Sequence, residues 1–259
     1  MIKSFDEFCS GQLSEGFSIQ GNMAGPITES IDYMRMDYVG FKKYIDALRD
    51  IQQIAKSLGN RPLLYRGGSF REEYRSSDIM LIGNVKGEGG KGRQRYQGGQ
   101  GTNPNQDAIM AGIYDRFGWD TDRLPIFVTP DASQTTTFGK TFAFIPKGDT
   151  EYVQSPKIRD ISVNTQDVNT EAEQKAIIDS YREGFPRIAD REAIVYAKEY
   201  YLIDIDPKRG IIDLLPRKWQ QQFSNMTKYS QIADLMGKEI WLAGKAKEAR
   251  IAAGMTVKP

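Results

Sequence analysis

Residues 61–68, Arg-Pro-Leu-Leu-Tyr-Arg-Gly-Gly, contain a short apolar stretch that is followed by Arg66 and two glycines. Because side chains alternate along a strand, Arg66 points to the face opposite Tyr65. The glycines after Arg66 let a ligand approach the backbone closely. A guanidinium binds phosphate through two parallel hydrogen bonds, so the segment indicates an anion site at the end of a strand. A solvated or salt-bridged arginine beside a turn is the alternative.

Two later segments place polar groups in a similar strand context. An apolar run at residues 124–130 ends with Thr129, and Asp131 can cap the short helical turn that follows. A second run, residues 190–204, has Glu192 at the mouth of its first strand. Glu192 is the best catalytic group available, because the chain contains no histidine. Thr129 has a structural alternative, which is to cap the turn.

Composition excludes several classes of function. Without histidine, the chain cannot use a Ser-His-Asp or Cys-His mechanism or a His-ligated metal, and we expect no metal site. The single cysteine, Cys9, cannot form an internal disulfide, which fits a reducing cytosol. No apolar run is long enough for a membrane span, so no membrane partner is expected. The net charge of +1 predicts no general attraction to nucleic acid and leaves only local patches.

Apolar periodicity predicts the helices that position these groups. Apolar residues at three- and four-residue steps predict a helix within residues 30–58. A second helix begins at Pro104 and ends at Gly118. A third begins with a capping box at Thr170 and runs through Tyr181.

The C-terminal half of the chain is predicted to contain short strands and helices separated by turns. Residues 190–204 indicate two strands joined by a turn near Ala197. Beyond residue 216, two short amphipathic helices end at Gly237. A strand at residues 239–242 and a basic terminal helix at 245–253 complete the prediction.

Residues 83–101 form a polar, glycine-rich and basic segment, which we expect to be a mobile loop because it cannot bury a core. Its arginines, Arg93 and Arg95, together with Tyr96, could contact a nucleic-acid backbone or a protein target. A solvated insertion is the alternative.

Three polar residues accompany apolar strands in a fixed order: an arginine after the first strand, Ser/Thr after the second and a glutamate at the start of the third. This order resembles the Arg-Ser-Glu type of ADP-ribosyltransferase. The resemblance covers roughly residues 60–205. The middle segment, with Arg123 ahead of it and Ser155-Pro156 through Asp160 after it, also resembles a group of phage proteins assigned to that fold. The segments that carry it are Leu64-Tyr65-Arg66-Gly67, Phe127-Val128-Thr129-Pro130-Asp131 with Phe138-Gly139, and Asp190-Arg191-Glu192-Ala193-Ile194.

The resemblance implies an α+β domain whose two packed, twisted sheets form an NAD cleft. NAD would be the co-substrate, and ADP-ribose would pass to a host protein or nucleic acid. Breaking the nicotinamide–ribose bond builds an oxocarbenium-like cation, which a nearby carboxylate stabilises. By resemblance that carboxylate is Glu192, while Arg66 holds the NAD phosphates and Thr129 braces the site.

The resemblance also assigns the remaining binding residues. Tyr65 and Gly67 would line the NAD cleft, and Phe138 or Phe142 would stack near the nicotinamide. Asp190 occupies the place where arginine-modifying members carry glutamate or glutamine, so the choice of acceptor residue stays open. The acceptor-binding residues would be Asp190, Arg93 and Arg95.

Residues 1–29 are expected to form a flexible leader. They resemble the head-targeting leaders of T-even-like phage internal proteins, with cleavage after Glu15 in Leu13-Ser14-Glu15-Gly16. That resemblance implies packaging in the phage head and delivery to the host cytoplasm; a frayed N-terminus is the alternative. The transferase-like domain would span residues 30–215, and residues 216–259 would be a helical C-terminal extension.

Two further functions stay open at this point. One is a non-catalytic virion structural protein with the same fold, because function does not follow from fold. The other is an NAD glycohydrolase, in which water takes the place of the macromolecular acceptor.

Overall fold

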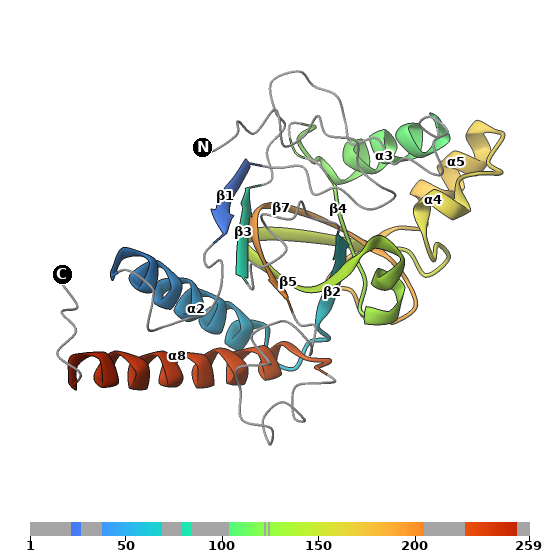
Figure 1. The fold of residues 1–259 in the computed structure, drawn as a ribbon. Helices are drawn as coiled ribbons and strands as arrows, with labels where there is room; N and C mark the ends of the chain where they lie inside the picture. Colours follow the sequence, from blue (N-terminus) through green and yellow to red (C-terminus); the bar gives the residue numbers. More distant parts are fainter. Residues whose placement is uncertain are drawn as a thin grey trace.

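The computed structural model describes residues 22–26, 38–68, 79–83, 104–121, 123, 125–204 and 226–252. They form an α+β fold, as the sequence predicts (Figure 1). The strands are β1 (Asn22–Pro26), β2 (Leu64–Gly68), β3 (Ile79–Gly83), β4 (Ile126–Val128), β5 (Lys140–Gln154), β6 (Arg182–Glu183) and β7 (Ala193–Asp204). The helices are α2 (Tyr38–Leu58), α3 (Pro104–Phe117), α4 (Ile161–Asn164), α5 (Glu171–Ile178), α8 (Tyr229–Ala252) and the 3-10 helix η2 (Ala132–Phe138).

All described strands join one antiparallel sheet, whereas the sequence-based expectation is two packed sheets. The strand order is β1-β3-β7-β5-β2, with β4 paired to β7 and β6 paired to β5. One residue beyond β4, Thr129 forms a bridge with Tyr65 of β2. Strands β2, β5, β7 and β4 are therefore linked in a closed ring of pairings.

Residues 193–204 form one continuous strand, so the predicted turn near Ala197 is wrong. In the pairing of β5 with β7, Lys147 lies opposite Glu199 and Thr150 lies opposite Ala197. Two residues of β5 thus face the single residue Lys198, which is a β-bulge. Gly148, in the bulge, has a φ of 76°. Lys198 and Glu199 are solvent-exposed residues of β7, and the extra residue of the bulge belongs to β5.

Helices α2 and α8 pack side by side below the sheet in Figure 1. Both contribute buried residues to the main core, which also contains the inner faces of β2, β3, β5 and β7. Leu48 and Ile51 of α2 and Ile232 and Leu235 of α8 are fully buried. The C-terminal helix therefore completes the same core as the sheet.

The tail from Tyr229 to Ala252 is a single helix, so the predicted break at Gly237 and strand at 239–242 are wrong. A Cβ added at Gly237 would lie 2.8 Å from Nε2 of Gln52. The glycine allows α8 to approach α2 closely, and its φ lies outside the left-handed range. None of the helices in the described ranges is long and apolar enough to cross a membrane.

A second, smaller core joins α3 and α5 to the other end of β7. Trp119 stacks on Tyr196, with ring centroids 5.1 Å apart and an interplanar angle of 10°. The indole Nε1 of Trp119 donates to Oε2 of Glu151 at 2.8 Å. The predicted capping box is confirmed at Thr170 and Glu173, although α5 ends at Ile178.

We expect Ile232→Ala to lower the free energy of unfolding by about 2–5 kcal/mol, the usual cost of truncating a fully buried aliphatic side chain. Chemical denaturation followed by circular dichroism measures this change. The matched control is Asp234→Ala, an exposed position on the same helix, which should shift stability by less than about 0.5 kcal/mol. A small effect at Ile232 would mean that α8 is not part of the cooperative core.

Candidate active site

A small recess lies where β2 and β4 meet, and we call it the Glu192 recess. It encloses about 50 Å³. Ligand pockets usually measure roughly 300–1,000 Å³, so only one group of a larger ligand fits inside and the remainder must extend beyond it. The recess is lined by Tyr65, Gly67, Phe127, Val128, Thr129, Gln134, Thr135, Arg159, Asp160 and Glu192.

Thr129 is fixed by its backbone and by its side chain. Its N–H donates to the carbonyl of Tyr65 at 3.0 Å, and its carbonyl accepts from the Tyr65 N–H at 2.7 Å. The hydroxyl accepts from the Asp131 N–H at 3.1 Å and donates to Oε1 of Gln134 at 3.3 Å. Thr129 therefore supports the turn before η2 and also lines the recess.

Glu192 lies immediately before β7 and is held against the segment that carries Arg159. The Glu192 N–H donates to the carbonyl of Arg159 at 2.9 Å. Its Oε2 accepts from the N–H of Ile161, the first residue of α4, at 3.2 Å. Glu192 is half-buried, and these bonds hold its backbone and one carboxylate oxygen beside the start of α4.

Gln154, at the end of β5, holds the loop that leads to Glu192. Its Oε1 accepts from the N–H groups of Arg187 and Ile188, both at 3.1 Å. Its Nε2 donates to the carbonyls of Ile188 at 3.0 Å and Arg191 at 3.1 Å. Sequence analysis missed this residue, whose only signal is an amide that follows the apolar Val153.

Arg159 and Asp160 also escaped sequence analysis as site residues. The turn before them is anchored by Ser155, whose Oγ accepts from the N–H groups of Lys157 at 3.0 Å and Ile158 at 3.2 Å. Beyond the turn, Oδ1 of Asn164 accepts from the N–H groups of Arg159 and Asp160, both at 3.1 Å. Side-chain hydrogen bonds on both sides therefore fix the segment that brings a cation into the recess.

The structure brings Thr129 and Glu192 together and places Arg66 on the other face of β2. Tyr65 and Gly67, on either side of Arg66, line the recess, whereas Arg66 is not among its lining residues. The Arg66 side chain is 3% exposed. Its guanidinium carbon lies 5.6 Å from the centroid of the Tyr200 ring.

The remaining predicted residues lie apart from the recess or outside the described chain. Phe142 pairs with Arg66 in the sheet and is buried in the main core. Phe138 is the last residue of η2. Asp190 is exposed and forms an ion pair with Arg191 at 3.1 Å. Arg93 and Arg95 fall outside the described residues, as do the glycine-rich segment beyond Gly83 and the leader outside β1.

The phenol of Tyr65 is neutral over the physiological pH range. Burial, and secondarily the charge of Asp131, raises the pKa of Tyr65 to about 12. Its hydroxyl donates to the carbonyl of Met226, just before α8. Tyr65 therefore links the recess to the C-terminal helix as a hydrogen-bond donor.

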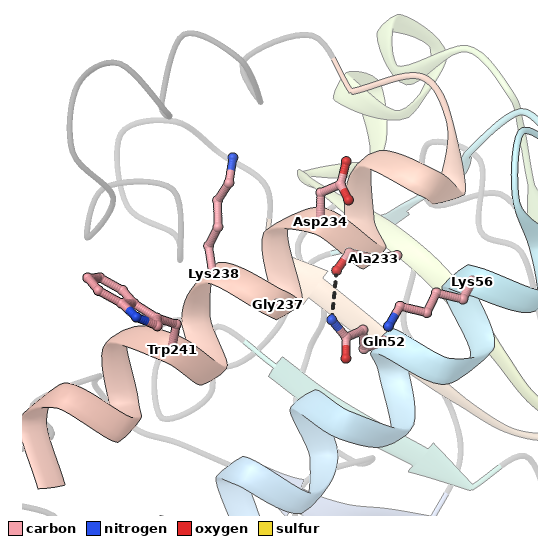
Figure 2. Close-up of a pocket in the computed structure, with 7 residues that line it drawn as sticks. All are labelled: Gln52, Lys56, Ala233, Asp234, Gly237, Lys238 and Trp241. Carbon is pink, nitrogen blue, oxygen red and sulfur yellow. Dashed lines mark hydrogen bonds between the residues drawn. The ribbon is translucent and has the colours of Figure 1, made fainter.

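A larger hollow of about 440 Å³ lies between α2 and α8 (Figure 2). Its lining residues are Gln52, Lys56, Ala233, Asp234, Gly237, Lys238 and Trp241. Figure 2 shows Trp241 and Lys238 projecting away from the helices, while Gln52 reaches across to the carbonyl of Ala233. We favour the smaller recess because carboxylates, hydroxyls and a guanidinium line it together.

Among the described residues, no group of three or more acidic or thiol side chains is placed to hold a metal ion. Comparison of the chain with protein-family models, curated proteins and solved structures found no match. We therefore infer a function from the chemistry of the recess and from the order of its residues in the chain.

We expect Gln154→Leu, which keeps approximate shape and removes four hydrogen bonds, to destabilise the protein by roughly 2–4 kcal/mol. The lost hydrogen bonds should destabilise the loop before Glu192 more than the rest of the protein. Amide hydrogen exchange at residues 187–191 should therefore accelerate more than exchange in α2. Gln166→Leu, at an exposed position, is the matched control. Unchanged protection at residues 187–191 would contradict the assignment of Gln154 as the group that holds this loop.

The raised pKa of Tyr65 predicts a loss of stability in alkali. The folded protein holds the phenol proton more tightly than the unfolded chain does. The stability that this provides is complete below the ordinary tyrosine pKa of 10.0 and is lost as pH rises toward the folded pKa of about 12. Tyr65→Phe should be less stable near neutral pH, because the carbonyl of Met226 loses its donor, and should lose less stability in alkali. Denaturation across this pH range measures both, and equal pH slopes for the two proteins would contradict the assignment.

Proposed function

We propose that the protein is an NAD-dependent mono-ADP-ribosyltransferase that transfers ADP-ribose to a host macromolecule. One observation carries the proposal: Thr129 and Glu192, which are 63 positions apart in the chain, line one recess beside the strand that carries Arg66. These two residues belong to segments that resemble those of the Arg-Ser-Glu transferases.

The chemistry of the recess supports glycosyl transfer. Cleavage of the nicotinamide–ribose bond develops positive charge on the ribose, and a fixed carboxylate stabilises that charge. Glu192 is held by its own backbone and through its Oε2, so it needs little rearrangement to act. The hydroxyl of Thr129 and the amide of Gln134 supply polar groups for a ribose or a carboxamide.

The fold is proposed to be that of the ADP-ribosyltransferases, with the curved sheet providing the cleft. The nicotinamide-ribose end would enter the recess, and the rest of NAD would extend outside it, because about 50 Å³ cannot hold a dinucleotide. The proposed phage origin, packaging in the virion and action in the host cytoplasm rest on the resemblance of the leader alone.

A non-catalytic virion protein with this fold is the second candidate. Two observations favour it: the small volume of the recess and the burial of Arg66 against Tyr200. An NAD glycohydrolase would use the same recess with water as acceptor. Binding and product analysis separate these three functions.

We expect Glu192→Gln to reduce ADP-ribose transfer by at least about 100-fold, because it removes the charge that stabilises the cation. NAD affinity and the free energy of unfolding should change little. The measurement is incubation with labelled NAD and host lysate, with free nicotinamide and labelled acceptor quantified separately.

The matched control is Glu183→Gln, an exposed glutamate of β6, which should keep full activity. Nicotinamide release without a labelled acceptor would identify a glycohydrolase. Wild-type transfer by Glu192→Gln would refute the role of Glu192. The absence of NAD binding and of transfer by the unmodified protein would refute the enzyme and favour the structural role.

A further inference from the structure

We propose that Arg159, rather than Arg66, is the cation that binds the phosphate adjoining the reacting ribose. This inference rests on the proposed function and names a residue to which the sequence motifs assigned no role. Its substrate class is a nucleoside diphosphate joined to ribose. Two features support it: the location of Arg159 and its lack of an ion-pair partner among the described residues. The other charges of the recess determine how strongly phosphate binding would depend on it.

The first feature is adjacency to Glu192. The carbonyl of Arg159 accepts the Glu192 N–H at 2.9 Å, so the two side chains start from one hydrogen-bonded backbone pair. Both line the recess. In NAD, the 5′-phosphate is attached to the same ribose that loses nicotinamide. A carboxylate for the ribose and a cation for the phosphate must therefore lie next to each other, as Glu192 and Arg159 do.

The second feature is that the guanidinium is available. Arg159 is exposed, and it forms no ion pair with any residue that the structure describes. The Glu192 carboxylate instead accepts from the Ile161 N–H. By contrast, the Arg66 side chain is buried over Tyr200, on the face of β2 that does not line the recess.

The other charged residues of the recess oppose anion binding. Two carboxylates, Asp160 and Glu192, line the recess with Arg159, and Asp131 lies just beyond Thr129. Oδ1 of Asp160 accepts from the Val163 N–H at 3.3 Å, so part of that carboxylate is engaged by α4. Because the surrounding carboxylates repel anions, phosphate binding here depends strongly on the single guanidinium among the lining residues.

The test is calorimetric titration of the full chain with ADP-ribose, NAD and nicotinamide. Arg159→Gln should raise the Kd for ADP-ribose and NAD by about 10- to 100-fold, the effect of losing hydrogen bonds to a charged group. Binding of nicotinamide, which lacks phosphate, should not change. Arg159→Lys should restore part of the affinity, because it keeps the charge but loses the bidentate geometry.

Arg187→Gln is the matched control, since this exposed arginine lies outside the recess, and its affinities should equal those of the unmodified protein. Denaturation curves establish that Arg159→Gln is folded. Equal ADP-ribose affinity in Arg159→Gln and the unmodified protein would overturn the inference, as would no ADP-ribose binding by the unmodified protein.

The two proposals fail in different ways. If NAD is consumed and its KM is unaffected by Arg159→Gln, the transferase or glycohydrolase reading stands and the role of Arg159 is refuted. If ADP-ribose binding depends on Arg159 but neither nicotinamide release nor labelling occurs, the phosphate site is supported and the catalytic proposal is refuted.

Discussion

Two backbone hydrogen bonds between Tyr65 and Thr129 join β2 to the end of β4, and the recess depends on them. They bring the hydroxyl of Thr129 beside Tyr65 and Gly67, while the pairing of β4 with β7 brings both next to Glu192. Strand pairing thus positions the backbone of Tyr65, Gly67 and Thr129, and the Thr129 hydroxyl then engages the side chain of Gln134. A ring of strands fixes such positions better than an open sheet edge, because no member can shift its register alone.

Loop segments complete the recess through side-chain amides and hydroxyls. Gln154 holds the loop before Glu192 through four hydrogen bonds, and Ser155 and Asn164 fix the segment before α4. Each of these residues satisfies backbone groups that no strand or helix could satisfy. The site residues with formal charge, Glu192 and Arg159, are therefore carried by backbone that is ordered independently of a ligand.

Sequence analysis predicted features that depend on neighbouring residues and missed those that depend on distant ones. The capping box at Thr170 is local and was correct. Gly237 was interpreted as a helix stop because its contact with Gln52, far away in the chain, is invisible in sequence. Alternation placed Tyr65 and Arg66 on opposite faces, but only the pairing with Thr129 decides which face lines the recess. Arg159 lies in the stretch from Ser155 to Asp160 that contributed to the resemblance, but it was given no role, because only a turn and Asn164 bring it to the recess.

The bridge between Tyr65 and Thr129 also determines when the site can exist. Within the sheet, β2 and β4 are also linked through β5 and β7, and Glu192 immediately precedes β7 in the chain. Contacts between distant segments form late, because the loops between them must be closed first. The strand pairs that place Glu192 beside Thr129 can therefore form only after β7 has been synthesised, and the hydrogen bond from Tyr65 to Met226 requires the segment just before α8. A nascent chain that ends before this segment lacks the complete recess.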